Sequence, residues 1–250
     1  MESHKDIQLL IIPDVHGRDF WKEALLDNPD VPAVFLGDYV DPYPNEGIDN
    51  MQALDNFQEI LQTVKTRPGK TYMLLGNHDI AYLDSRIVCS RHNYFEEEII
   101  HQKLVESEES FCMAYEQVIA GKRFLFTHAG VSVGWIAEHK ELFGGLPINA
   151  GLFNTMFWSD RLHHYFMDAL SDVSAARGGT SRYGSMIWAD AQELMIPFQS
   201  IPDVIQVFGH TQQKVQATVL KDRSYCLDWR RPFYIDCCGE IRDYCSDDRI

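Results

Sequence analysis

The chain has 250 residues, of which 45% are hydrophobic and 24% are charged, and this globular composition excludes disordered, collagen-like and coiled-coil proteins. Its formal net charge of −15 is unfavourable for contact with the phosphates of nucleic acids or with anionic membrane surfaces. We therefore expect neither nucleic acid nor a membrane as a partner. The N-terminal residues show no export signal and the six cysteines are interpreted as free thiols, which favours a cytoplasmic protein.

Short apolar runs in the sequence predict buried strands, because continuous apolar segments of this length are typical of strands in a core. The five main runs are residues 7–12, 33–36, 71–75, 123–127 and 204–208. Three shorter strand-like runs follow in the tail and suggest a second, partly antiparallel sheet. These are residues 215–220, 225–227 and 232–235.

Segments with helical character lie between the strands. Residues 48–64 repeat apolar side chains on one stripe, from Met51 to Val64, as an amphipathic helix does. The acidic segment 95–120 is also predicted to be helical. Strands that alternate with helices indicate an α/β fold, and we expect one domain over residues 1–250.

Polar side chains that can bind metals follow each of the five main runs. They are Asp14, His16, Asp38, Asn77, His128 and His210. The carboxyl ends of strands are where ligands bind in open α/β sheets, and glycines beside these residues permit the sharp turns that such a site needs. We therefore expect the six side chains to gather at one edge of the sheets.

Three oxygen ligands and three imidazoles, with a carboxylate that can bridge, suit two divalent metal ions roughly 3.5–4 Å apart. Mixed nitrogen and oxygen ligation favours manganese, iron or zinc over magnesium or calcium. Manganese is our first expectation, with iron and zinc as alternatives. No cysteine is positioned to compete for these metals.

Five motifs in order carry a resemblance to a known family. They are Asp-x-His-Gly at 14–17, Gly-Asp-x-x-Asp at 37–41, Gly-Asn-His-Asp at 76–79, His-Ala-Gly at 128–130 and Gly-His-Thr at 209–211. Together they resemble the calcineurin-like metallophosphoesterases. The resemblance implies a fold of two mixed β-sheets flanked by helices, and hydrolysis of phosphoesters by a hydroxide that two metals activate.

The resemblance also implies roles for single residues. Asp14 and His16 would bind the first metal, Asp38 would bridge both, and the second would be bound by Asn77, His128 and His210. In the same way, His78 matches the residue that donates a proton to the leaving group. Asp41 matches the acid that orients this histidine.

Further segments resemble the phosphoprotein phosphatase branch of the family, although that branch has an arginine where this chain has Pro42. Residues 157–160, Phe-Trp-Ser-Asp, are similar to a segment of the branch, and Arg177 resembles its second phosphate-binding arginine. Arg86 is the next candidate to bind the substrate phosphate. The other arginines considered for the missing position are interpreted as surface charges; these are Arg18, Arg91 and Arg182.

The resemblance favours a bacterial-type serine/threonine phosphatase that acts on a phosphorylated protein or a small phosphoester. A hydrolase of diadenosine tetraphosphate, or another phosphodiesterase, is the alternative. It would need an aromatic nucleoside pocket, for which Tyr43, Tyr82 or Trp188 could serve. The sequence gives no indication of the oligomeric state.

Overall fold

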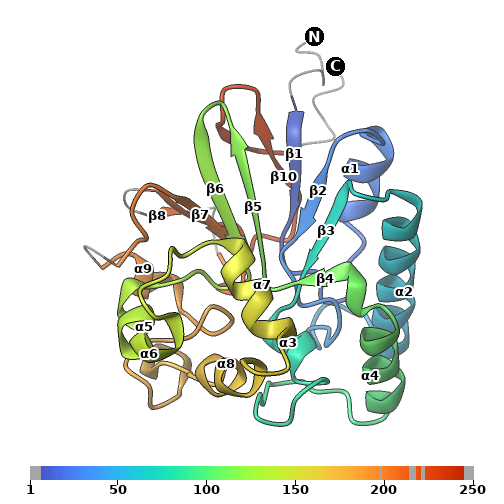
Figure 1. Cartoon of the computed structure of the whole chain (residues 1–250). Helices are drawn as coiled ribbons and strands as arrows, with labels where there is room; N and C mark the ends of the chain where they lie inside the picture. Colours follow the sequence, from blue (N-terminus) through green and yellow to red (C-terminus); the bar gives the residue numbers. More distant parts are fainter. Residues whose placement is uncertain (1–6, 197–198, 214–217, 221–222, 245–250) are drawn as a thin grey trace.

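The computed structural model describes residues 7–196, 199–213, 218–220 and 223–244, and two β-sheets form its centre (Figure 1). The first sheet has the order β11-β10-β1-β2-β3-β4 and the second has the order β5-β6-β7-β9-β8. Helices flank the pair, so the structure confirms the predicted α/β fold with two mixed sheets. None of the helices in the described residues is long and apolar enough to cross a membrane.

The first sheet has a parallel centre and an antiparallel edge. The strands β1 (Ile7–Ile12), β2 (Ala33–Phe35), β3 (Thr71–Leu74) and β4 (Phe111–Cys112) run parallel to one another. Two strands from the end of the chain add the antiparallel edge, β10 (Phe233–Asp236) beside β1 and then β11 (Ile241–Asp243). The carboxyl ends of β1, β2 and β3 therefore lie at the same edge.

The second sheet repeats this plan with other strands. A hairpin of β5 (Ala114–Ile119) and β6 (Lys122–Thr127) is followed by β7 (Ile205–Phe208), which runs parallel to β6. The strand β9 (Ser224–Cys226) is parallel to β7, and β8 (Thr218–Leu220) is antiparallel to β9. The ends of β6 and β7 thus also lie side by side.

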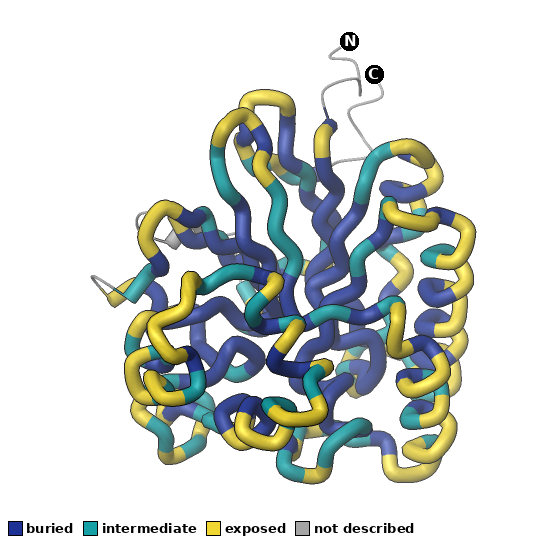
Figure 2. Tube along the Cα trace, in the orientation of Figure 1, coloured by how far each residue is buried: buried dark blue, intermediate teal, exposed yellow. Residues whose placement is uncertain are grey.

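Side chains that alternate along the strands fill two separate apolar layers. Leu9 and Ile11 of β1 pack with Phe124 and Phe126 of β6 between the sheets. Leu10, on the opposite face of β1, packs in the larger cluster beneath the helices. Figure 2 shows the central strands largely buried, while the outer strand β5 is partly exposed and the helices expose one side. Strands covered on both faces have no polar face, which explains their continuous apolar sequences.

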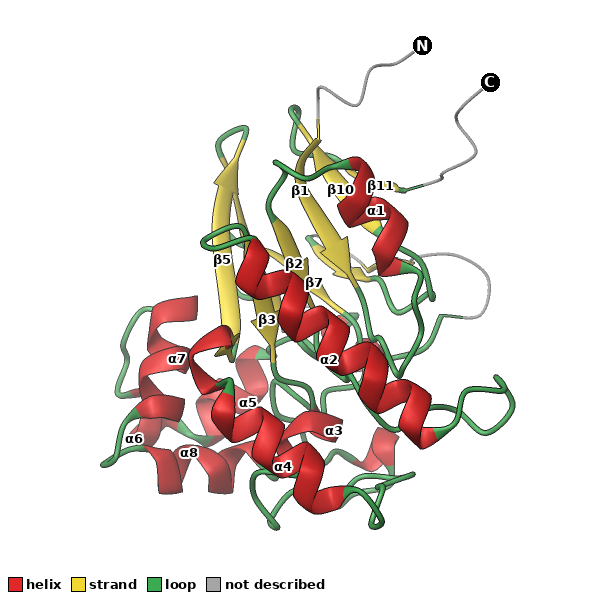
Figure 3. Cartoon of the chain, turned by 90° about the vertical axis from the view of Figure 1, so that its right-hand side faces the viewer, coloured by secondary structure: helices red, strands yellow, loops and turns green. Residues whose placement is uncertain are grey.

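The helices form two groups on the outside of the sheets. The helices α1 (Trp21–Asp27), α2 (Asn50–Thr66) and α4 (Glu97–Glu106) lie on the side of the first sheet (Figure 3). On the side of the second sheet lie α5 (Val133–Glu138), α6 (Lys140–Phe143), α7 (Ala150–Trp158) and α8 (His163–Leu170). Short elements complete the set, namely α3 (Asn77–Ile80), α9 (Ala191–Leu194), and 3-10 turns at Glu108–Ser110 and Ala175–Arg177.

The helix α2 shows how the sequence defines an element. The side chain of Asp49 accepts a hydrogen bond from the backbone of Gln52, and the side chain of Gln52 accepts one from the backbone of Asp49. This reciprocal pair is a capping box, which defines where the helix begins. Leu54 and Phe57 of the predicted stripe are buried, whereas Met51 is 51% exposed. The helix was therefore predicted correctly, but its apolar face is narrower than expected.

Two predictions about secondary structure were wrong. The segment 95–120 is helical only to Glu106, and its end forms β5 and pairs with β6 through a two-residue turn. Ala120 and Gly121 both have positive φ in this turn, as the tight hairpin requires. The tail strands also do not share one sheet, because β10 joins the first sheet while β8 and β9 join the second. Residues 215–217 of the tail prediction lie outside the described residues.

Candidate metal centre and active site

The loops that follow β1, β2, β3, β6 and β7 bring the six predicted metal-binding side chains together. The backbone of these loops turns sharply. Among the described residues, nine that are not glycine have a positive φ, and they include His16, Asp38, Asp41, Arg91 and His210. Left-handed backbone is costly for residues with a Cβ and gathers at functional sites. Its concentration here marks this edge of the sheets as the functional site.

Asp38 lies between two groups of ligand atoms. Its Oδ2 is 3.5 Å from Nε2 of His16 and 3.5 Å from Nε2 of His128. The Nδ1 atom of His16 donates a hydrogen bond to the carbonyl of Val40 at 2.9 Å, which leaves Nε2 with the lone pair that a metal needs. Asp38 is thus the carboxylate that would be shared between two cations held by these two groups.

The second group joins His128 to Asn77 and His210. The Nδ1 atom of His128 donates to the carbonyl of Leu36 at 2.8 Å, so its Nε2 is an acceptor. This Nε2 is 3.0 Å from Oδ1 of Asn77 and 3.1 Å from Nδ1 of His210. Two acceptors at 3.0 Å repel each other unless a cation lies against both. In addition, Nε2 of His210 is buried without a hydrogen-bond partner.

Two glycines allow the carboxylates to approach the backbone closely. Both carboxylate oxygens of Asp14 accept a hydrogen bond from the backbone of His210 at 3.0 Å, and a Cβ on Gly209 would lie 1.9 Å from Oδ1 of Asp14. A Cβ on Gly76 would lie 2.2 Å from Oδ1 of Asp38. These glycines are needed because the carboxylates of Asp14 and Asp38 occupy the space of a side chain.

Burial shapes the charge of this site. It raises the pKa of Asp38 well above the ordinary value, and the neighbouring carboxylate of Asp14 raises it further. Burial also lowers the pKa of the imidazoles of His16, His128 and His210. The imidazoles are thus neutral, which is the form that binds metals. These three side chains therefore provide no positive charge to balance the carboxylates of Asp14 and Asp38. This donor set fits two divalent cations.

His78 and Asp41 form a hydrogen-bonded pair beside the metal-binding side chains. Nδ1 of His78 donates to Oδ2 of Asp41 at 2.7 Å, and the imidazole ring lies 5.0 Å from the ring of His16, between centroids. The hydroxyl of Tyr82 donates to the other oxygen of Asp41. Burial raises the pKa of Asp41 to about 6, and the hydrogen bond from Tyr82 acts in the opposite direction.

Asp79 organises the loops around the site without being a predicted ligand. Its carboxylate accepts hydrogen bonds from the backbone of Asp38 at 2.7 Å, of Gly76 at 2.8 Å and of Tyr39 at 3.0 Å. Burial raises its pKa to about 7, against the effect of these three bonds. Asp79 therefore joins the loop after β2 to the loop after β3.

Arg177, the first arginine predicted to bind phosphate, lies beside His210. It donates to the carbonyl of His210 at 2.9 Å, and its guanidinium is 3.2 Å from the carboxylate of Asp190. The ring of Trp188 packs edge to face against the ring of His210, with the two centroids 5.5 Å apart. Arg177 thus reaches the edge of the metal centre with its charge already paired.

Arg86, the second predicted arginine, is directed elsewhere. Its guanidinium bonds to Asp84 at 2.5 Å and to Asp168 of α8 at 2.8 Å. Asp168 is exposed on α8 and Asp84 is half-buried after α3, and no hydrogen bond joins Arg86 to the six predicted ligands within the described ranges. The structure does not bring Arg86 together with the other site residues.

Arg91, which was expected to be a surface charge, enters the site instead. Its Nη2 is 3.3 Å from Nε2 of His78, and its Nε donates to the carbonyl of Asp41 at 3.2 Å. The guanidinium carbon lies 3.8 Å from the centre of the Tyr43 ring. The guanidinium therefore lies over the segment where Pro42 replaces an arginine.

Four residues of this site were not predicted in the place that the structure gives them: Arg91 was interpreted as a surface charge, Tyr82 as a candidate for a nucleoside pocket, and Asp79 and Asp228 were given no role. Asp228 is a buried carboxylate whose pKa is raised by burial and by Asp14. For Asp79 the signal was its place in the Gly-Asn-His-Asp motif. The others lie outside every motif, and Asp228 follows β9 as the metal-binding residues follow their strands.

The two-sheet fold, the histidine and carboxylate ligand set and the adjacent His78–Asp41 pair together define a metal-dependent phosphoesterase. The sequence comparison agrees, because residues 7–214 match the family described as calcineurin-like phosphoesterase. The chain belongs to this family, whose members typically depend on a pair of metal ions. A search of curated protein sequences found no match.

Solved structures show the same fold at low sequence identity. A cold-active protein tyrosine phosphatase is similar with a TM-score of 0.59 and 14% identity, over 95% of this chain and 78% of that chain. A protein serine/threonine phosphatase from Saccharomyces cerevisiae has a TM-score of 0.51 and 14% identity, over 100% of this chain and 84% of its own. At such identities the likeness concerns the fold alone.

Proposed function

We propose that the protein is a metal-dependent phosphomonoesterase that removes phosphate from serine or threonine residues of proteins, with manganese as its metal. The observation that carries this proposal is the His78–Asp41 pair beside the metal centre. An alkoxide is a poor leaving group and needs a proton as it departs, whereas the phosphate that leaves a dinucleotide polyphosphate does not. A built proton donor therefore favours a phosphomonoester substrate with an alkoxide leaving group.

The side chains divide the chemistry between them. Divalent cations held by the six ligands would supply Lewis acidity toward the phosphate and lower the pKa of an attacking water. Asp41 holds the imidazole of His78 through Nδ1, so that Nε2 is the atom that faces the leaving oxygen. Tyr82 holds Asp41 from its other oxygen. The hydrogen-bonded series fixes the imidazole before the substrate arrives, which reduces the reorganisation that the reaction requires.

The aromatic residues that the dinucleotide alternative needs are engaged otherwise. Tyr82 is buried and bonds to Asp41, and Tyr43 packs beneath the guanidinium of Arg91. Trp188 remains half-buried against His210. These contacts support a phosphomonoester over a nucleoside ligand.

The test compares substrates with different leaving groups. Protein stripped of metal by chelation and reloaded with Mn²⁺ is assayed on phosphoserine and phosphotyrosine peptides, nitrophenyl phosphate and diadenosine tetraphosphate. We expect turnover of the phosphoserine peptide, and a loss of about 10²- to 10⁴-fold in His78→Ala, the usual contribution of a general acid. The loss should be much smaller on nitrophenyl phosphate, whose leaving group needs no proton.

The control is His139→Ala, because His139 also pairs with an aspartate, at 2.6 Å from Asp172, but lies in the helical group outside the site. It should retain the activity of the unmodified protein. Preference for diadenosine tetraphosphate would contradict the proposed substrate class. An equal loss of activity in His78→Ala on every substrate would contradict the role of His78 as proton donor, and turnover of phosphotyrosine alone would reassign the substrate.

A further inference from the structure

The guanidinium of Arg91 lies in the site but belongs neither to the six predicted metal ligands nor to the His78–Asp41 pair. Arg91 belongs to the segment between α3 and α4, and its backbone φ of 63° turns the side chain back toward the loop after β2. Two contacts then hold it, the hydrogen bond from Nε to the carbonyl of Asp41 and the ring of Tyr43 at 3.8 Å. Stacking on an aromatic ring and a fixed Nε leave an arginine little rotational freedom.

The free end of Arg91 points at the reacting centre. Because Nδ1 of His78 donates to Asp41, Nε2 of His78 is an acceptor, and Nη2 of Arg91 donates to it at 3.3 Å. A guanidinium has five N–H donors, and the structure gives partners to three of them: the carbonyl of Asp41, the side chain of Ser90 and His78. The two that remain can bond to the oxygens of a phosphate.

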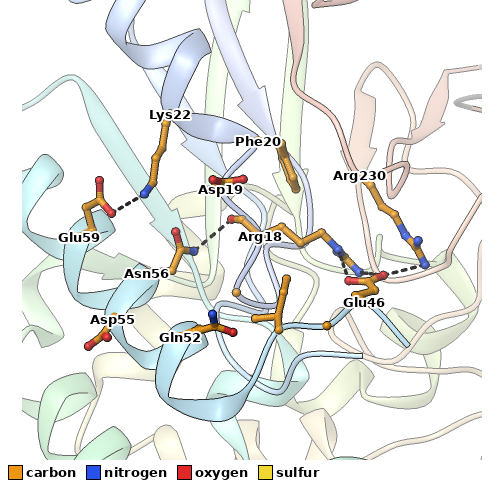
Figure 4. Close-up of a pocket in the computed structure, with 13 residues that line it drawn as sticks. Arg18, Asp19, Phe20, Lys22, Glu46, Gln52, Asp55, Asn56, Glu59 and Arg230 are labelled. Carbon is orange, nitrogen blue, oxygen red and sulfur yellow. Dashed lines mark hydrogen bonds and ion pairs between the residues drawn. The ribbon is translucent and has the colours of Figure 1, made fainter. Parts of the chain in front are cut away.

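The other arginines near the centre are engaged in ion pairs with carboxylates. Arg18 and Arg230 both pair with Glu46, at 2.7 Å and 2.9 Å, on the wall of a neighbouring hollow of about 650 Å³ (Figure 4). Arg177 pairs with Asp190. In the part of the chain that the structure describes, no carboxylate forms an ion pair with Arg91, so Arg91 carries positive charge that an anion can use.

We infer that Arg91 binds the substrate phosphate, and so does from a different loop what an arginine in place of Pro42 would do. This inference rests on the proposed phosphomonoesterase function. The ligand is the phosphate dianion, which arginine recognises through charge-assisted hydrogen bonds. A phosphate that takes over Nη2 also releases Nε2 of His78 from its bond with Arg91. Nε2 carries no proton while it accepts from Arg91, so once released it can take up from solvent the proton that it then gives to the leaving oxygen.

The experiment measures phosphate binding directly, apart from turnover. Orthophosphate is titrated into the Mn²⁺-loaded protein by calorimetry, and nitrophenyl phosphate supplies KM and kcat. We expect Arg91→Ala to weaken orthophosphate binding by about 10- to 100-fold, the loss expected when charge-assisted hydrogen bonds are removed, and to raise KM to a similar extent. Arg91→Lys keeps the charge but not the fork of donors, and should restore part of the affinity.

Arg182→Ala is the matched control, because Arg182 also lies over a tyrosine ring, that of Tyr183 at 5.3 Å, but has no contact with the site among the described residues. It should bind orthophosphate as the unmodified protein does. Unchanged orthophosphate binding in Arg91→Ala, or absent binding in the unmodified protein, would overturn the inference, as would the same loss in Arg86→Ala instead. Arg91-dependent orthophosphate binding without turnover of the phosphoserine peptide would refute the proposed function but support this inference.

Discussion

Gly76 offers the sharpest test of how the backbone positions the metal centre. In Gly76→Ala the new methyl group would lie 2.2 Å from Oδ1 of Asp38 and 2.8 Å from both the backbone nitrogen of Asp38 and Cε1 of His128. Ordinary van der Waals contact begins at 3.4 Å, so the distance between the new methyl group and Oδ1 of Asp38 must increase by about 1.2 Å. Neither neighbour can yield easily, because Oδ1 of Asp38 accepts from the backbone of His78 and the His128 ring is bonded to Leu36.

The expected result is loss of metal before loss of the fold. Displacement of a ligand by about 1 Å is comparable to removing an interaction that orients it, which typically costs 10- to 100-fold in metal affinity. Crowding in a packed interior costs about 1–3 kcal/mol in the free energy of unfolding. We therefore expect a folded protein with weakened metal binding, and Mn²⁺ affinity and circular dichroism measure the two effects separately.

Gly151→Ala is the control for Gly76→Ala. Gly151 lies exposed in the first turn of α7, where an added methyl group meets only the side chain of Asn149, at 3.3 Å. This variant should retain its metal. If Gly76→Ala binds Mn²⁺ with the affinity of the unmodified protein, the close approach of this backbone does not position Asp38, and the reasoning fails.

Two further predictions follow from the buried carboxylates. Burial raises the pKa of Asp41 to about 6. Below that pH Asp41 gains a proton and no longer accepts from His78, so activity should fall. Tyr82→Phe removes a hydrogen bond that lowers this pKa and should move the acidic limb of the pH–rate profile to higher pH, whereas an unmoved limb would contradict the role of Asp41. The raised pKa of Asp38 and Asp79 means that the folded metal-free protein binds protons more tightly than the unfolded chain, and its stability falls as pH rises from about 4 through the pKa values of the folded state. Metal should therefore raise the unfolding temperature more at pH 8 than at pH 5, and an equal rise at both would contradict this account.

The fold and the gathering of the six predicted ligands at one edge of the sheets were predictable because both depend on short-range patterns. A strand buried on both faces is a continuous apolar run, and a ligand that must stand at its end follows that run directly, as Asp14 follows β1 and His210 follows β7. Strand and ligand thus occur within a few residues of each other. The pattern could not predict the partners of the strands, and for this reason β10 was assigned to the wrong sheet.

The segment 95–120 shows where local patterns mislead. Acidic residues and apolar spacing fit a helix up to Glu106, but Ala114–Ile119 forms β5 because β6 provides its hydrogen-bond partners. The two positive φ values at Ala120 and Gly121 make this pairing possible. Tertiary pairing therefore overrides the helical pattern, as it often does for strands.

Arg91, which we infer to bind phosphate, illustrates why the position of such an arginine is harder to predict than the positions of the six predicted ligands. A metal ligand needs a backbone position at the end of a strand, which ties it to a motif. An arginine reaches its target through a long side chain, so the guanidinium can come from another loop. Here the arginine lies 50 positions along the chain from Asp41. The orientation of its side chain depends on a left-handed backbone and on the ring of Tyr43, neither of which a motif encodes. The chemistry requires a guanidinium at a point in space, and the sequence position from which it comes is free to change.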